Sequence, residues 1–260
     1  MSKLIERIKK VYQDTAPSMG FNVRTVPSKN QAMPFIAAIS LKDMNLVPDI
    51  LAMGIDALLL QINDTDSTKL TFTSLLKKIP DVTWGIYMNN FSDEQIDQAI
   101  KAGCDFIIFE AKAAPVSVIE QDKLGKLLIM NQALPDGLIE AAGQLPIDAI
   151  VMDFQEETNP SMLHLMLCQY YTDLTDKPLF SIVSTAIDTC ALETLHKYGV
   201  DGIITKIKTK SSLKQAINLR QMINKLPPVK DRGRRKQRLT PCLGSSGFSS
   251  GEDEYEYEEI

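Results

Sequence analysis

The sequence predicts a single (βα)8 barrel, the TIM-barrel class of α/β fold. One sequence motif recurs four times, at residues 54–63, 103–112, 146–155 and 199–208. In each copy a turn and an Asp are followed by an apolar run and a polar residue. Spacings of 49, 43 and 53 residues separate its aspartates, which are Asp56, Asp105, Asp148 and Asp201. Each unit is long enough for two strands and two helices, so four units make eight of each. The length of 260 residues fits one such barrel and a tail.

The chain is expected to begin with a helix that closes one end of the barrel. Residues 2–13 place Leu4, Ile8 and Val11 on one face, which is the pattern of an amphipathic helix. A loop rich in Pro, Ser and Asn follows over residues 14–33. Strand and helix then alternate, with the odd strands at residues 34–40, 82–89, 125–131 and 178–184 and the even strands in the four repeats.

Local signals mark the helix ends. Ser92 and Gln95 have the spacing of a capping box, and Gly54, Gly103 and Gly199 follow helix ends as left-handed caps. Residues 111–123 leave room for little more than two helical turns. The repeated Asp opens its strand and therefore lies at the N-terminal face, so we interpret it as a structural residue that ties loops down.

The barrel domain is expected to cover residues 1–226, and residues 227–260 form a tail of different character. The tail is basic over residues 230–238, then rich in Gly and Ser, then acidic, and it has no helical or strand periodicity. We expect it to be disordered. A solvated tail is the more common interpretation of such charges, contact with a protein partner is the alternative, and nucleic acid is not the expected partner.

Composition excludes several classes of protein. The chain is 44% hydrophobic and 23% charged, which is typical of a globular domain. Its four cysteines form no C-x-x-C pair, and both histidines, His164 and His196, fall inside predicted helices, so a zinc centre is not indicated. The N-terminus has no apolar signal region and the apolar runs are too short for a membrane span. We therefore expect a cytoplasmic protein.

Alternation along the strands predicts a ring of polar side chains at the open end. In each repeat the sixth position after the Asp is apolar (Ile62, Ala111, Phe154 and Ile207) and should face the helices. The fifth positions, which are Gln61, Glu110, Asp153 and Lys206, should then face inward in one layer. Inward third positions form an apolar floor of Leu59, Ile108, Val151 and Ile204. Further polar candidates at strand ends are Asn63, Lys112, Gln155, Lys208, Ser40, Asn89, Asn131 and Ser184.

Three readings of this ring stay open. In the first, Lys206 forms a Schiff base with a carbonyl substrate while Glu110 or Asp153 moves protons, and no cofactor is needed. In the second, Glu110 and Asp153 hold a magnesium ion that polarises an enolate. In the third, the charges pair only with one another and the barrel is a non-catalytic binding or assembly module that acts through its tail. If one carboxylate is engaged elsewhere, the Lys206 amine becomes accessible.

The layout resembles the aldolase-type (βα)8 barrel superfamily over about residues 33–226. The resemblance rests on the repeat and on the phrase LETLHKYGVDGIITKI, residues 192–207. The resemblance implies the fold, whereas the candidate site comes from the polar ring at the strand ends. From that ring we expect a lyase or aldolase that acts on a small anionic carbonyl compound. Its catalytic residues would be Lys206, Glu110 and Asp153, and its substrate-binding residues would be Gln61, Asn89, Asn131, Lys112, Ser184 and Lys208. The glycines that form a phosphate cup after strands seven and eight in many such barrels are missing here.

Overall fold

Eight parallel strands close into a barrel in the computed structural model, which describes residues 2–13, 33–62, 82–88, 90, 92–130, 134–154 and 159–226. The strands pair in chain order, and β8 pairs with β1 to complete the circle. This confirms the predicted (βα)8 fold. The strands are β1(Phe35–Ser40), β2(Ala57–Ile62), β3(Trp84–Met88), β4(Phe106–Glu110), β5(Gly125–Ile129), β6(Ala149–Asp153), β7(Leu179–Val183) and β8(Val200–Lys206).

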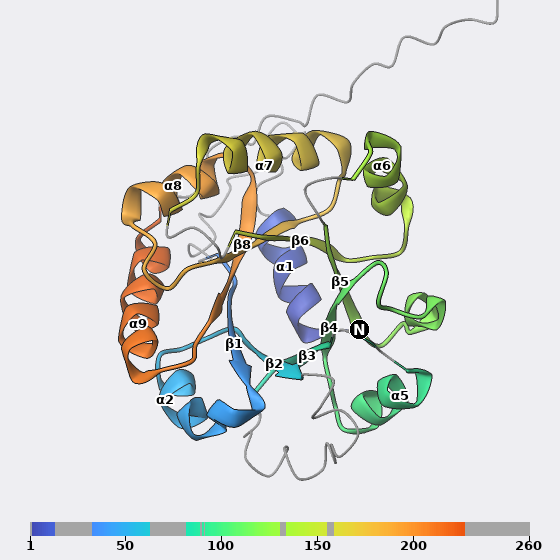
Figure 1. Ribbon diagram of the computed structural model, residues 1–260, viewed down its shortest axis with the longest axis horizontal. Helices are drawn as coiled ribbons and strands as arrows, with labels where there is room; N and C mark the ends of the chain where they lie inside the picture. Colours follow the sequence, from blue (N-terminus) through green and yellow to red (C-terminus); the bar gives the residue numbers. More distant parts are fainter. Residues whose placement is uncertain are drawn as a thin grey trace, which may run out of the picture.

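Helices form an outer ring around the strands, seen end-on in Figure 1. They are η1(Leu41–Leu46), α2(Val47–Ala52), α5(Asp93–Lys101), η2(Val116–Glu120), α6(Asp136–Gln144), α7(Met162–Leu174), α8(Thr189–Lys197) and α9(Lys210–Lys225). The short connection predicted over residues 111–123 contains only the 3-10 helix η2. The capping box of Ser92 and Gln95 is present, and Gly54, Gly103 and Gly199 have positive φ as predicted.

The first helix, α1(Lys3–Gln13), closes one end of the barrel and lies across its centre in Figure 1. Its residues Leu4, Ile5 and Ile8 are at most 3% exposed and belong to the apolar cluster inside the barrel. The Asp105 carboxylate fixes its start by accepting hydrogen bonds from the backbone N–H groups of Lys3 (2.7 Å) and Leu4 (3.0 Å). A carboxylate at a helix N-terminus satisfies N–H groups that have no partner within the helix. The predicted closing helix is confirmed.

The other repeated aspartates join neighbouring strands at this same closed end. Asp56, Asp148 and Asp201 accept hydrogen bonds from the backbone N–H groups of Phe35 (2.7 Å), Lys126 (3.0 Å) and Leu179 (2.8 Å). Each donor lies at or near the start of the preceding odd strand. The structural role predicted for the repeat is therefore confirmed, and it explains why the motif recurs.

Two apolar layers result from the alternation of side chains along the strands. One layer fills the space between strands and helices, and the other fills the inside of the barrel. Phe180 occupies the inside opposite Gly202, where an added Cβ atom would approach the phenyl ring to 2.1 Å. A glycine is required there because the interior is already close-packed. Apolar side chains of the inner layer therefore fill the barrel around Phe180.

Some predicted features lie outside the described residues, among them the tail of residues 227–260 and the polar candidates Asn63 and Gln155. Within the part of the chain that the structure describes, no helix is both long and apolar enough to cross a membrane.

Removal of residues 227–260 is expected to lower the melting temperature by less than about 5 °C, which corresponds to roughly 1–2 kcal/mol for a domain of this size. The reason is that the pairing of β1 with β8 and the packing of α9 complete the barrel by residue 226. Differential scanning fluorimetry of the shortened chain checks this. Deletion of residues 1–13 is the matched control, and its loss should be larger because it removes α1. A greater loss from the tail deletion would mean that the tail packs on the barrel.

Candidate active site

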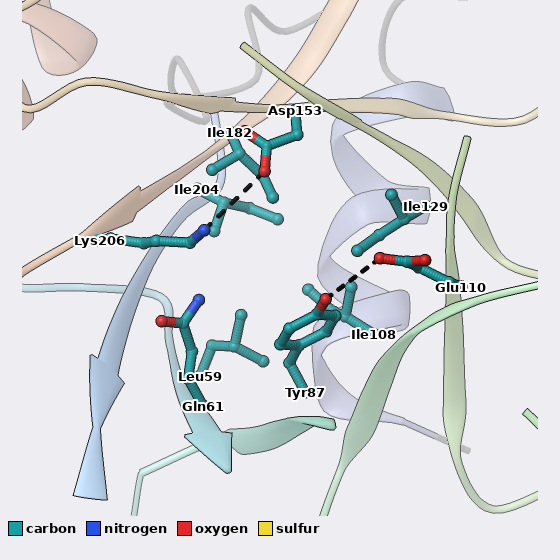
Figure 2. Close-up of a pocket in the computed structure, with 10 residues that line it drawn as sticks. All are labelled: Leu59, Gln61, Tyr87, Ile108, Glu110, Ile129, Asp153, Ile182, Ile204 and Lys206. Carbon is teal, nitrogen blue, oxygen red and sulfur yellow. Dashed lines mark hydrogen bonds and ion pairs between the residues drawn. The ribbon is translucent and has the colours of Figure 1, made fainter. Parts of the chain in front are cut away.

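The four predicted ring residues lie around one cavity at the C-terminal ends of the even strands. Glu110, Asp153 and Lys206 are the last residues of β4, β6 and β8, and Gln61 is the penultimate residue of β2. Figure 2 shows their side chains around a common space. The sixth positions Ile62, Phe154 and Ile207 are buried in the outer layer, as alternation requires. Ala111 differs and is exposed, because β4 ends at Glu110 and the chain turns there.

The floor of the cavity is apolar. Leu59, Ile108 and Ile204 line it as predicted, and Ile129 and Ile182 of the odd strands complete it. Val151 was also predicted to belong to the floor; it is fully buried inside the barrel but is not part of the cavity lining. About 480 Å³ of empty space, part of it open to solvent, lies above this floor.

The charged groups of the ring form two separate pairs. Lys206 Nζ lies 3.9 Å from Asp153 Oδ2, and the Tyr87 hydroxyl donates a hydrogen bond of 3.3 Å to Glu110 Oε1. Figure 2 shows the two pairs on different sides of the cavity, with the Tyr87 oxygen and the Lys206 nitrogen both directed into it. Glu110 therefore contacts Tyr87, and only Asp153 of the two carboxylates contacts Lys206. With one carboxylate engaged in this way, the sequence predicts that the Lys206 amine is accessible.

Burial controls the protonation of Lys206. Desolvation lowers the pKa of its ammonium group from the ordinary 10.5, Asp153 acts in the opposite direction, and the charge of Lys208 lowers it further. The lowering prevails because the Asp153 carboxylate is distant for an ion pair and its side chain is 43% exposed, so solvent screens the attraction. Lys206 therefore releases its proton more readily than a surface lysine.

Tyr87 is a site residue that the sequence reasoning missed. Desolvation is the main reason that its pKa is raised to about 12, and the negative charge of Glu110 and the hydrogen bond to it add to the shift. Its phenol therefore keeps its proton across the neutral range. Tyr87 pairs in register with Gln61 on β2. Alternation along the strand could have found Tyr87, because it lies two residues before Asn89, and residues two apart face the same side of a strand.

The other predicted substrate-binding residues that the structure describes are not among those that line the cavity. Lys112 is exposed in the turn after β4, and Lys208 is exposed two residues beyond the end of β8. Ser184 follows β7 and is half-buried, and its hydroxyl accepts a hydrogen bond of 3.3 Å from the Ala186 N–H. Asn89 and Asn131 lie outside the described residues.

The described residues offer few metal ligands at the mouth. They contain no group of three or more His, Cys, Asp or Glu side chains that could hold a metal ion together. Glu110 and Asp153 remain the two carboxylates that a magnesium ion could use, with water in its other positions. His164 and His196 lie in α7 and α8 as predicted, away from the cavity lining.

Comparison with known proteins places the fold. No protein-family model matches the chain, and no curated protein matches it in sequence. Among solved structures, the tryptophan synthase of Mycobacterium tuberculosis superimposes with a TM-score of 0.61 at 10% identity, over 85% of this chain and 96% of that one. The chain therefore has the fold of a (βα)8 TIM barrel.

Two further solved structures have the same architecture. The tryptophan synthase alpha-subunit of Pyrococcus furiosus, solved as a mutant, gives a TM-score of 0.55 at 12% identity, over 75% of this chain and 98% of that one. The YdjI aldolase of Escherichia coli K12 gives a TM-score of 0.53 at 12% identity, over 86% of this chain and 95% of that one. At these identities the likeness is one of fold, so the activity has to be argued from the cavity.

Proposed function

We propose that this aldolase-type barrel is a lyase or aldolase that forms a Schiff base between Lys206 and a small anionic carbonyl compound. The observation that carries the proposal is the position of Lys206: its amine points into a cavity with an apolar floor, and burial lowers the pKa of its ammonium group. A neutral amine is the nucleophile that carbonyl addition needs.

In this proposal the Lys206 nitrogen attacks the carbonyl carbon, and the carbonyl oxygen leaves as water. Asp153, whose carboxylate lies 3.9 Å from the amine, takes one proton from the Lys206 ammonium group before the attack. It then delivers that proton to the carbinolamine oxygen, which departs as water. The product is a protonated imine that withdraws electrons from the neighbouring bond. Gln61 lies on the same rim and is positioned to orient the substrate through its amide.

Charge distribution sets the orientation of the substrate. Glu110 and Asp153 repel an anionic group from the inside of the cavity. Lys208 is exposed beyond the end of β8, and its positive charge acts on Lys206. The substrate would therefore place its carbonyl in the cavity and its anionic group outward toward Lys208, with Lys112, Ser184, Asn89 and Asn131 as the remaining candidate contacts.

Borohydride trapping tests the proposal. The protein is incubated near neutral pH with pyruvate, glyoxylate or glycolaldehyde, reduced with borohydride and digested for peptide mass spectrometry. We expect a stable secondary amine on Lys206, and the two 2-oxo acids should react better than the uncharged aldehyde. An adduct spread over surface lysines would contradict the proposal. If no adduct forms but magnesium binds and Glu110→Gln abolishes that binding, the metal reading replaces it. An inert protein that binds no metal would favour a binding or assembly module.

A further inference from the structure

The Tyr87 and Glu110 pair lies across the cavity from Lys206 and is not used in forming the Schiff base. Tyr87 comes from β3 and Glu110 from β4, and both line the same cavity as Lys206. The phenolic oxygen faces the central space, while its proton is directed to Glu110 Oε1 over 3.3 Å. An imine carbon attached to Lys206 would bring the adjacent carbon of the substrate into this space.

We propose that Tyr87 and Glu110 form a proton relay for the carbon next to the imine, an inference that rests on the Schiff-base function proposed above. Tyr87 would be a catalytic residue, since its oxygen takes the substrate proton directly. Glu110 would be the final acceptor. The substrate class is thereby narrowed to carbonyl compounds that have a hydrogen on the carbon next to the carbonyl group.

The step balances without a further reactant. The substrate C–H bond breaks and its proton forms a new O–H bond on Tyr87, while the original Tyr87 proton passes to Glu110. The electron pair of the C–H bond forms the C=C bond of an enamine and neutralises the iminium nitrogen. The proton on Glu110 is replaced by one from solvent, and return along the same path then places a solvent hydrogen on the substrate carbon.

Two features of the pair suit this role. The phenol is protonated at neutral pH, because burial and Glu110 raise the pKa of Tyr87 to about 12. It therefore donates its proton to the Glu110 carboxylate, and its oxygen accepts the substrate proton as its own proton leaves. Asp153 is paired with Lys206 on the other side, which leaves Glu110 as the carboxylate joined to Tyr87. Proton transfer by a positioned group of this kind typically contributes about 10²-fold to 10⁴-fold in rate.

Deuterium exchange separates the relay from imine formation. Pyruvate is incubated with the protein in deuterium oxide, and loss of its methyl signal is followed by proton NMR. Borohydride trapping is measured in parallel. The wild type should do both, whereas Tyr87→Phe should keep the Lys206 adduct and exchange at least about 10²-fold more slowly. Tyr198→Phe is the matched control, because Tyr198 is 41% exposed and lies at the end of α8. It should behave as the wild type.

Glu110→Gln is the second variant, and it also moves a spectroscopic signal. This variant should slow the exchange of the substrate hydrogen while the Lys206 adduct persists. The pKa of Tyr87, followed by the ultraviolet absorbance of its phenolate, should also fall below about 12, because the neighbouring negative charge is gone. Exchange at the wild-type rate in both variants would overturn the relay and leave the Schiff-base proposal intact. Loss of the adduct in Tyr87→Phe would also overturn it. Absence of any adduct in the wild type would overturn both.

Discussion

Replacing Lys206 with methionine is expected to abolish the borohydride-stable adduct and to lower any carbonyl turnover by at least about 10³-fold. Methionine fills similar space but has no nitrogen to attack the carbonyl carbon. Intact-protein mass spectrometry after reduction measures the adduct directly. Lys214→Met is the matched control, since Lys214 is exposed on α9. It should retain the full adduct.

The same substitution should leave the barrel no less stable near neutral pH. An unfolded lysine has the ordinary pKa of 10.5, and the folded value is lower because of burial. Between these two values the unfolded state binds more protons, so stability rises with pH through that window. Below the window the charged Lys206 destabilises the fold, and methionine removes this penalty. Loss of the contact between Asp153 and Lys206 costs little, since the Asp153 side chain is 43% exposed.

Both measurements are needed to identify the role of Lys206. If Lys206→Met lost the adduct and also unfolded at a much lower urea concentration, the loss would be one of structure. If it kept the adduct, another lysine would be the nucleophile and the proposed site would be wrong. Adduct formation should also persist to lower pH than on a surface lysine, because the pKa of Lys206 is lowered.

The repeat made most of the fold predictable. The Asp at the start of each even strand has a local function, as the hydrogen bond that Asp201 accepts from the Leu179 N–H illustrates. Because the strands are parallel and the side-chain period is two, fixing that one register fixes which residues reach the mouth. Gln61, Glu110, Asp153 and Lys206 could therefore be placed around one cavity without coordinates.

The partners of these residues could not be predicted in the same way. Alternation gives the direction of a side chain along its own strand but not the distance between side chains on different strands. The sequence left Lys206 between two carboxylates, whereas Glu110 contacts Tyr87 and only Asp153 contacts Lys206. The sign of the Lys206 pKa shift depends on that division, because two close carboxylates would have opposed desolvation more strongly.

One aspartate shows that an identical motif can acquire a different task. Asp105 accepts from the start of α1, whereas Asp56, Asp148 and Asp201 accept from the start of an odd strand. The repeat alone does not distinguish them. The difference arises because α1 crosses the closed end next to β4 and β5, where Gly125 leaves room for Ser2 and Ile5.

Replacing Asp56 with alanine is expected to lower the free energy of unfolding by about 3–5 kcal/mol, the range seen when one member of a buried ion pair is removed. The Asp56 side chain is 3% exposed and contacts Arg7 at 2.5 Å and Arg220 at 3.2 Å. It also accepts from the Phe35 N–H at 2.7 Å. One carboxylate thus joins α1, β1 and α9, and alanine would leave the mostly buried Arg220 guanidinium, 13% exposed, without this partner.

Urea unfolding followed by circular dichroism checks this expectation, with Asp49→Ala as the matched control because Asp49 is exposed on α2. The control should change stability by less than about 0.5 kcal/mol. Asp56→Asn should lose less than Asp56→Ala, since its amide oxygen still accepts from Phe35 while the charge that balances Arg7 and Arg220 is gone. If Asp56→Ala were as stable as the control, the repeated aspartate would not fix the closed end of the barrel. The register of β1 against β2, which sets the inward direction of Gln61, would then rest on the backbone pairing of the two strands and on apolar packing.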